Sequence, residues 1–183
     1  MTRRQSDAAL VRRFMAVVGS RVPVEATVYL TGGATAVLHG WRPTTDDVDI
    51  KVVADDEDSV LRALRPLADE IDMNLEFASP DQFIPVKHGW EDRSPFIERR
   101  GRVTFRHFEY PAQALAKVHR LVAHDREDVL AMVERGLVDA AVVWAYYHAI
   151  QVDLFRYPGV REDRLEVHLR EVLGPDPQVT PQH

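Results

Sequence analysis

The sequence contains no cysteine and no long uninterrupted apolar segment. Without cysteine, neither a disulfide framework nor a thiolate-bound metal is available to stabilise the fold. A run of about eighteen apolar residues, which a membrane-spanning helix requires, is absent as well. Residues 1–18 carry charges but lack the apolar core and the cleavage site of a signal peptide, so they are predicted to form an amphipathic helix. We therefore expect a cytoplasmic protein with no membrane partner.

Histidine is present, but no pair has the HExxH or other spacing that is typical of a zinc site. The net charge of −6 argues against a general nucleic-acid binder, although the charge is unevenly distributed. Acidic side chains predominate in residues 46–81, and basic side chains predominate in residues 87–126. This segregation suits a metal site that faces a phosphate-rich substrate. A solvated surface with chance segregation explains it equally well.

The hydrophobic periodicity predicts an α/β (α+β) fold, in which a mixed sheet with helices is followed by a C-terminal helical region. Helices are predicted at 6–19, 34–40 and 56–71, with Ser6 as an N-cap, and strands at 26–30, 47–53, 73–78 and 102–110. Residues 79–101 are rich in proline and glycine and are predicted to be irregular. Further helices are predicted at 112–123, 126–136, 139–155 and 161–173. The expected domains are 1–110 for the α/β core and 111–173 for the helical region, with 174–183 as a loose tail.

Two adjacent glycines, Gly32 and Gly33, lie between a predicted strand and a predicted helix. Glycine lets the backbone approach a ligand where any Cβ would clash, and a helix N-terminus favours an anion. The turn therefore suits a phosphate chain, with the hydroxyl group of Thr31 or Thr35 as an additional contact. A tight turn or close packing is the commoner explanation of such a glycine pair.

Three carboxylates follow on predicted strands. Asp47 and Asp49 lie two residues apart, so their side chains project from the same face of the strand, and Glu76 occupies the polar face of the next one. Three strand carboxylates on one sheet face can hold two divalent ions about 4 Å apart, an arrangement that transfers phosphoryl and nucleotidyl groups. Mg²⁺ prefers oxygen ligands of this kind. The alternative is a solvated strand face without a metal.

The order of these features resembles a known fold. The pair Gly32–Gly33, the spacer 34–46, the Asp-Val-Asp of 47–49 and the strand around Glu76 resemble the polymerase-β type of nucleotidyltransferase. "NLEFASPDQFIPVKHGW", "SPFI" and "YPAQALAKVHR" extend the resemblance to a bacterial family of small nucleotidyltransferase-like proteins (DUF6036-like). These are distant relatives of the abortive-infection and toxin–antitoxin nucleotidyltransferases.

The resemblance implies a nucleotidyltransferase that uses an NTP and Mg²⁺, with two ions bound or with Mn²⁺ in their place. It implies an acceptor such as a tRNA end, another RNA or a protein, and an antitoxin partner. It also implies that Lys117 assists the triphosphate, with Asp125 or Asp128 as a nearby acid. The alternative for Lys117 is a solvated helix face shared with Arg120. Arg42 either reaches a phosphate or pairs with the neighbouring Asp46.

The resulting hypothesis is an Mg²⁺-dependent transfer of a nucleotide to an acceptor hydroxyl. The amides of the glycine pair hold the triphosphate, Asp47 and Asp49 bind both metals, and Glu76 binds the catalytic metal and helps deprotonate the acceptor. Lys117 offsets charge on the leaving side. The competing hypothesis is a nucleotide- or partner-binding protein of the same fold with little catalytic turnover.

Overall fold

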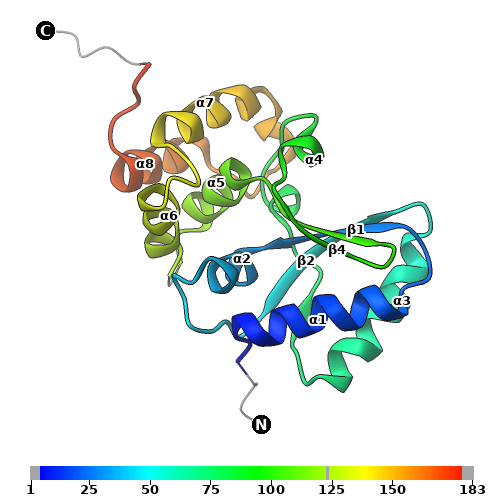
Figure 1. Ribbon diagram of the computed structural model, residues 1–183. Helices are drawn as coiled ribbons and strands as arrows, with labels where there is room; N and C mark the ends of the chain where they lie inside the picture. Colours follow the sequence, from blue (N-terminus) through cyan, green and yellow to red (C-terminus); the bar gives the residue numbers. More distant parts are fainter. Residues whose placement is uncertain (1–4, 123, 179–183) are drawn as a thin grey trace, which may run out of the picture. The chain divides into compact units, whose positions relative to one another are not determined.

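The computed structural model describes residues 5–122 and 124–178 of the chain (Figure 1). These residues form two compact units. The sheet unit consists of the described residues up to Ser79 together with Glu91–Phe108, and the helical unit consists of Pro80–Trp90 together with the described residues from Glu109 onward. The helical unit thus includes Pro80–Trp90, which belong to the segment that was predicted to be irregular.

The sheet unit contains a five-stranded mixed sheet with the strand order β3-β2-β1-β5-β4. Its strands are β1 (Ala26–Thr31), β2 (Val48–Ala54), β3 (Leu75–Glu76), β4 (Phe96–Arg100) and β5 (Val103–His107). β1 pairs antiparallel with β2 and parallel with β5, while β2 pairs parallel with β3, and β4 and β5 form an antiparallel pair. The predicted fold class, a mixed sheet followed by helices, is confirmed.

Two of the predicted strand assignments were wrong. Residues 96–100 form β4, although they were predicted to be part of an irregular segment. This strand lies at the sheet edge, where its side chains are mostly exposed and do not show the alternation of a half-buried strand. Conversely, only Leu75–Glu76 of the predicted strand 73–78 pairs with β2.

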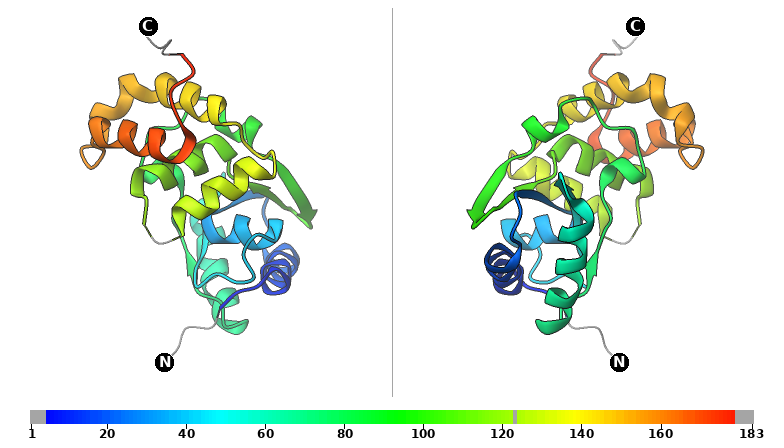
Figure 2. Two further views of the ribbon diagram at one scale, coloured as in Figure 1. Left: turned by 90° about the vertical axis from the view of Figure 1, so that its left-hand side faces the viewer. Right: turned by 90° about the vertical axis from the view of Figure 1, so that its right-hand side faces the viewer.

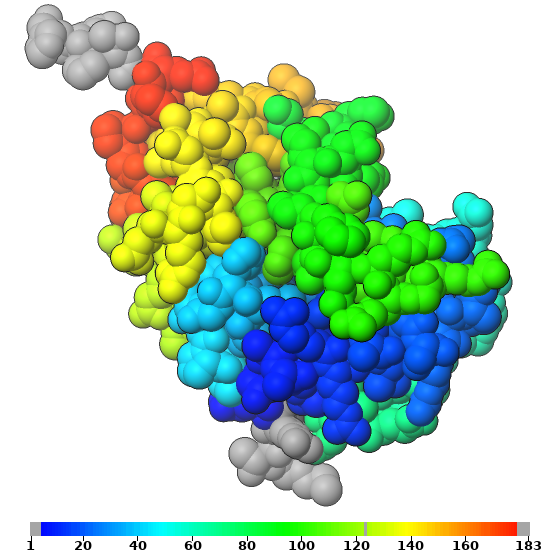
Figure 3. All heavy atoms as spheres, in the orientation of Figure 1, coloured from blue at the N-terminus to red at the C-terminus, as the bar shows by residue number. Residues whose placement is uncertain are grey.

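Three helices complete the sheet unit: α1 (Ala8–Arg21), α2 (Gly32–His39) and α3 (Glu57–Glu70). The buried side chains of β1 and β2, including Val28, Leu30 and Ile50, share a hydrophobic core with Phe14 of α1 and Leu64 of α3. α1 and α3 pack against one another beside the sheet (Figures 1 and 2). The outward side of α1 is visible in the space-filling view, in dark blue (Figure 3). Burial of this one face leaves the polar strand positions on the other.

The N-terminus of α1 differs from the prediction. Asp7, rather than Ser6, is the N-cap, because its carboxylate accepts a hydrogen bond of 2.8 Å from the Leu10 amide. Ser6 instead exchanges backbone hydrogen bonds with Thr45. The predicted end of the second helix is confirmed, since Gly40 caps α2 in the left-handed conformation with φ of 78°.

The helical unit is built from α5 (Tyr110–Arg120), α6 (Asp125–Glu134), α7 (Ala140–Ile150) and α8 (Glu162–Leu173). Two 3₁₀ turns, η1 (Pro80–Gln82) and η2 (Gln151–Arg156), also belong to it, and the short α4 (Trp90–Arg93) lies at a boundary of the units. Trp144 and Tyr147 of α7 are buried within the helical unit, and their rings meet edge to face. Within the described residues, no helix has the length and apolar character that crossing a membrane requires. Ala123 and residues 179–183 of the predicted tail lie outside the described residues.

Candidate active site in the sheet unit

The glycine pair forms the first turn of α2, directly after β1. Gly32 has a φ of 57°, in the left-handed region that favours glycine, and a Cβ at this position would lie 2.6 Å from Oδ2 of Asp49. A Cβ at Gly33 would overlap with the hydroxyl oxygen of Thr45 and lie 2.7 Å from its Cβ. Both glycines are therefore required by the folded chain itself, so the explanation by a tight turn and close packing holds. The same geometry also places the Asp49 carboxylate at the N-terminus of α2, where the helix dipole favours a negative charge.

The predicted acidic residues are brought together by the strand register. Asp49 lies opposite Thr31 on β1 and opposite Glu76 on β3, so these three side chains share one face across three adjacent strands. Asp49 and Glu76 are both half-buried, whereas Thr31 is only 5% exposed. Val48 and Ile50, which alternate with Asp49, face the core. The sequence alternation in β2 thus delivers a pair of accessible carboxylates beside the α2 turn.

Asp47 precedes β2 and is held separately. The Asn74 side-chain amide donates a hydrogen bond to Oδ1 of Asp47, and the hydroxyl group of Thr45 donates one of 3.0 Å to its carbonyl oxygen. The backbone carbonyl oxygen of Asn74 also accepts a hydrogen bond of 2.8 Å from the Val48 amide. Asn74 therefore holds both the side chain of Asp47 and the start of β2 in place. Asn74 was not predicted as a site residue, although its position two residues before Glu76 in the predicted strand 73–78 was a usable signal.

These carboxylates have the chemistry of a magnesium site but do not form a complete ligand set. Nowhere in residues 5–122 and 124–178 do three acidic or histidine side chains converge closely enough to hold a metal ion. Mg²⁺, however, is commonly bound by one or two carboxylates together with the phosphates of the substrate. The in-register pair Asp49 and Glu76 fits that arrangement, because it supplies two adjacent oxygen donors and leaves the remaining coordination positions to a ligand.

Thr35 has a structural partner in this arrangement. Its side chain is 1% exposed, and its hydroxyl group lies 3.0 Å from Nδ1 of His107 and 3.3 Å from the Leu30 carbonyl oxygen. The predicted contact between this hydroxyl group and a triphosphate would require the buried Thr35–His107 pair to open. Burial, assisted by the neighbouring His39, lowers the pKa of His107 to about 3, so its ring is neutral at physiological pH.

A column of rings continues from this buried pair. His39 stacks on His107 with ring centroids 4.7 Å apart, and it also stacks on Trp41 at 5.6 Å. Trp41 and Arg42 are half-buried in the loop between α2 and β2. The neighbouring Asp46 accepts a hydrogen bond of 3.3 Å from the Gln5 side chain. Sequence reasoning missed the His39–His107 contact because it joins residues on two separate elements.

Lys117 belongs to the helical unit and is buried, with 6% of its surface exposed. Its ammonium nitrogen lies 2.6 Å from Oδ2 of Asp128 and 3.3 Å from Oδ1 of Asp125. Asp125 also accepts two hydrogen bonds from the Arg120 guanidinium group, at 2.9 and 2.8 Å, and one from the Val122 amide. The alternative that Lys117 lies on a solvated helix face is wrong. Asp125 or Asp128 was predicted as the acid near Lys117, and Lys117 contacts both of them.

The electrostatics of this cluster are balanced internally. Burial by itself raises the pKa of Asp125, but the hydrogen bonds from Arg120 and the charge of Lys117 outweigh it, so the net pKa is lowered. The buried carboxylate of Asp125 thus stays ionised beside the two cations. A triphosphate contact by Lys117 would have to replace at least one of these ion pairs.

Comparison with known proteins gave one result. The model of a family described as "Nucleotidyltransferase of unknown function (DUF6036)" matches residues 11–157. No curated protein and no solved structure matched the chain. The matched range includes the glycine turn, the Lys117 cluster and the carboxylates of Asp47, Asp49 and Glu76.

Proposed function

Because the chain belongs to the DUF6036 family of nucleotidyltransferases of unknown function, we propose that it transfers a nucleoside monophosphate from an NTP to an acceptor hydroxyl group. The observation that carries the proposal is the register that sets Asp49 directly opposite Glu76, beside the N-terminus of α2. An accessible carboxylate pair next to a helix N-terminus offers oxygen ligands for a cation and amide donors for phosphate within one small region.

In the proposed reaction, the acceptor oxygen attacks the α-phosphorus of the NTP in line with the leaving group. The bond from the acceptor oxygen to the α-phosphorus forms as the bond from that phosphorus to the bridging oxygen of the β-phosphate breaks, so pyrophosphate leaves. Mg²⁺ or Mn²⁺, as one or two ions, would be held by Asp49 and Glu76 with Asp47 alongside, and it supplies charge neutralisation on the phosphates. Glu76 takes part in removing the acceptor proton, while the first turn of α2, with Gly32, Gly33 and the adjacent Thr31, binds phosphate oxygens.

The acceptor in this proposal is an RNA, such as a tRNA end, or a protein side chain. Family resemblance also supports a role as the toxin of a toxin–antitoxin pair, with an antitoxin as partner. Arg42 lies in the loop that follows α2 and is the proposed additional phosphate contact on this side. Its guanidinium group would offer a phosphate two parallel hydrogen bonds.

The test is a label-transfer experiment with the full chain, each α-labelled NTP, Mg²⁺ or Mn²⁺, and total RNA or total protein as acceptor. We expect Asp49→Asn and Glu76→Gln to reduce transfer at least a hundredfold, because each removes one of the paired charged oxygen ligands at the reacting phosphate. Glu134→Gln is the matched control, since Glu134 is highly exposed on α6 and lies in the helical unit. Transfer by both site variants at the rate of the control would contradict the proposed active site.

The second candidate function is binding of a nucleotide or partner with little turnover. Its supporting observation is that Asp47 is engaged by Asn74, while no complete three-ligand metal set exists among the described residues. Titration of Mn²⁺ by electron paramagnetic resonance, with and without NTP, separates the two functions from a non-functional face. Binding that depends on Asp49 without any label transfer supports the second candidate. Equal Mn²⁺ affinity for the wild type and Asp49→Asn contradicts the metal site on which the proposed transfer depends.

A further inference from the structure

A second feature with ligand-binding chemistry lies wholly within the helical unit. A hollow of about 300 Å³ lies between α5 and the start of α8. It is lined by His119 and Arg120 of α5, by Gly159 in the loop before α8, and by Arg161, Arg164 and Leu165 at the start of α8. Its charged lining residues are all cations. A hollow of this volume is at the lower end of the range for small-molecule sites and has room for a phosphate ester.

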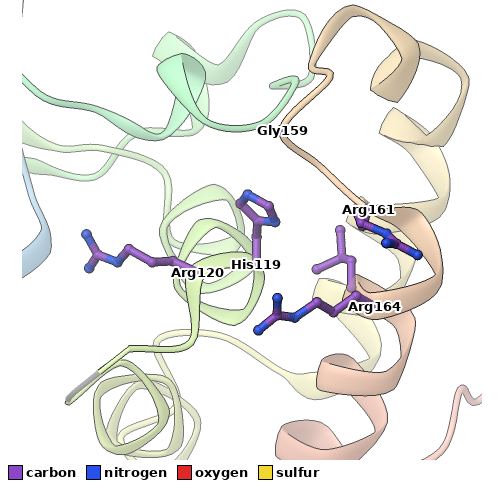
Figure 4. A pocket seen from close by; sticks show the side chains of 6 residues that line it. His119, Arg120, Gly159, Arg161 and Arg164 are labelled. Carbon is purple, nitrogen blue, oxygen red and sulfur yellow. The ribbon is translucent and has the colours of Figure 1, made fainter.

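The cationic groups approach the hollow from two helices. Figure 4 shows the side chain of Arg164 extending from α8 toward α5, where the ring of His119 projects into the hollow. The guanidinium groups of Arg120 and Arg161 extend away from its centre in opposite directions (Figure 4). An anion at the centre would therefore meet His119 and Arg164 first. Arg120 and Arg161 define the positive rim.

Arg164 is held near the hollow by a hydrogen bond to a histidine ring, and this hydrogen bond involves no carboxylate. Nε of Arg164 donates to Nε2 of His168 at 3.3 Å, and Nδ1 of His168 lies 2.9 Å from the Val118 carbonyl oxygen. Since a carbonyl oxygen can only accept, Nδ1 of His168 carries the proton and Nε2 is the acceptor. The charge of Arg164 is thus oriented by a neutral ring rather than neutralised by an acid in this contact.

The two rim arginines differ in how firmly they are held. Arg120 is fixed by Asp125, whose side chain is only 3% exposed, so the guanidinium group of Arg120 is held in one position at the rim. Arg161 pairs with Asp163 at 2.9 Å, but both side chains are at least 70% exposed. Such an exposed pair stabilises by only about 0–1 kcal/mol and exchanges readily for a better acceptor.

The pKa of His119 is lowered by its surroundings in the hollow. Burial is the main cause that lowers its pKa, and the neighbouring His168 and Arg164 lower it further. A bound anion would oppose the effect of the cationic Arg164 and favour the protonated ring. The hollow therefore holds a histidine whose charge state would respond to occupation.

We propose that this hollow binds the phosphate group of a phosphate-bearing ligand between His119 and Arg164, with Arg161 turning inward from its exposed pair. Guanidinium groups match phosphate oxygens in geometry as well as in charge. The ligand is a phosphate ester, either a terminal phosphate on a mononucleotide or a backbone phosphate of RNA. This site does not depend on the transfer reaction proposed for the sheet unit.

The experiment is an NMR titration of the full chain in which the histidine side-chain resonances are followed. The probes are inorganic phosphate, AMP, and a short single-stranded RNA with hydroxyl groups at both ends. Binding is expected to shift the His119 resonances and to raise the pKa of His119. A response to phosphate and AMP but not to the RNA assigns the site to terminal phosphates, whereas the reverse assigns it to backbone phosphates.

Variants make the assignment specific. Arg164→Gln is expected to weaken binding at least tenfold, and Arg161→Gln about threefold or more, with unchanged circular dichroism because both side chains are exposed. Arg12→Gln is the matched control, because it removes the same charge from an exposed position on α1. The proposal is overturned if none of the three probes shifts His119. It is also overturned if Arg164→Gln and Arg161→Gln both bind like the Arg12→Gln control.

Discussion

Replacing Lys117 by methionine tests the buried ion pairs that Lys117 forms with Asp125 and Asp128. The substitution keeps most of the side-chain length but removes the charge that lies 2.6 Å from Asp128 and 3.3 Å from Asp125. Both carboxylates are at most 3% exposed, so water cannot take the place of the ammonium group. Removing one partner of a buried ion pair costs about 3–5 kcal/mol, because the other charge stays buried without compensation.

That loss is large against the total stability of a folded protein, about 5–15 kcal/mol. For a chain of this size it corresponds to a decrease in melting temperature of roughly 6–20 °C. Urea unfolding followed by circular dichroism measures the free energy directly. Lys51→Met, at a half-exposed position on β2, is the matched control and is expected to change stability by less than about 1 kcal/mol.

The double variant Lys117→Met/Asp128→Leu separates structure from function. Replacing a buried ion pair by apolar side chains is often close to neutral, so we expect it to recover at least about 1–2 kcal/mol relative to Lys117→Met. Full transfer activity in the recovered variant would confine Lys117 to a structural role. Recovered stability with lost transfer would instead identify Lys117 as a phosphate contact. A loss below about 1 kcal/mol for Lys117→Met, without recovery in the double variant, would refute the buried ion pair.

Two further predictions concern the sheet unit. Gly33→Ala is expected to lower the unfolding free energy by about 1–3 kcal/mol because its Cβ overlaps Thr45, whereas Gly159→Ala, which meets no atom within 4 Å, should be close to neutral; equal urea midpoints for the two variants would contradict this packing. His107 has a folded pKa of about 3, below the ordinary value near 6.5, so the unfolded chain gains a proton first as the pH falls. The contribution of His107 to the free energy of unfolding is therefore fully present above pH 6.5 and is lost progressively toward pH 3. The loss is about 2 kcal/mol between pH 7 and 5. His107→Gln, which keeps an acceptor for Thr35, should show a shallower decline, and an identical pH dependence in both proteins would argue against a buried neutral ring.

Much of the sheet unit follows from local sequence patterns. The alternation of Val48, Asp49 and Ile50 predicts both the strand and the side on which the carboxylate lies, because successive side chains point to opposite faces. The glycine pair similarly predicts a turn that enters a helix. These features depend on the two-residue periodicity of a strand and on backbone sterics, and both can be recognised in a short segment of sequence.

The edge strand β4 could not be predicted in this way. Pro95 and Gly101 flank residues 96–100, and they also mark irregular segments, so the local signal favoured a loop. Its strand conformation depends on antiparallel pairing with β5, which follows it through a tight turn at Gly101. The pairing that stabilises β4 is a property of two segments, and the mostly exposed side chains of β4 leave little hydrophobic pattern.

The burial of Lys117 shows why the candidate site was harder to predict than the fold. On helical periodicity, Lys117 lies beside Arg120, and such a pair indicates a polar face toward solvent. Its actual partners, Asp125 and Asp128, lie beyond a left-handed residue at Leu121 that ends α5 and redirects the chain into α6. The ion pairs form only because the α5–α6 corner folds the acids back over the lysine. The turn after a helix therefore determines whether a charged residue near the helix end is buried with partners or exposed to solvent. In this chain that turn makes Lys117 part of the helical core and leaves Arg120 at its surface, where it borders the hollow proposed to bind phosphate.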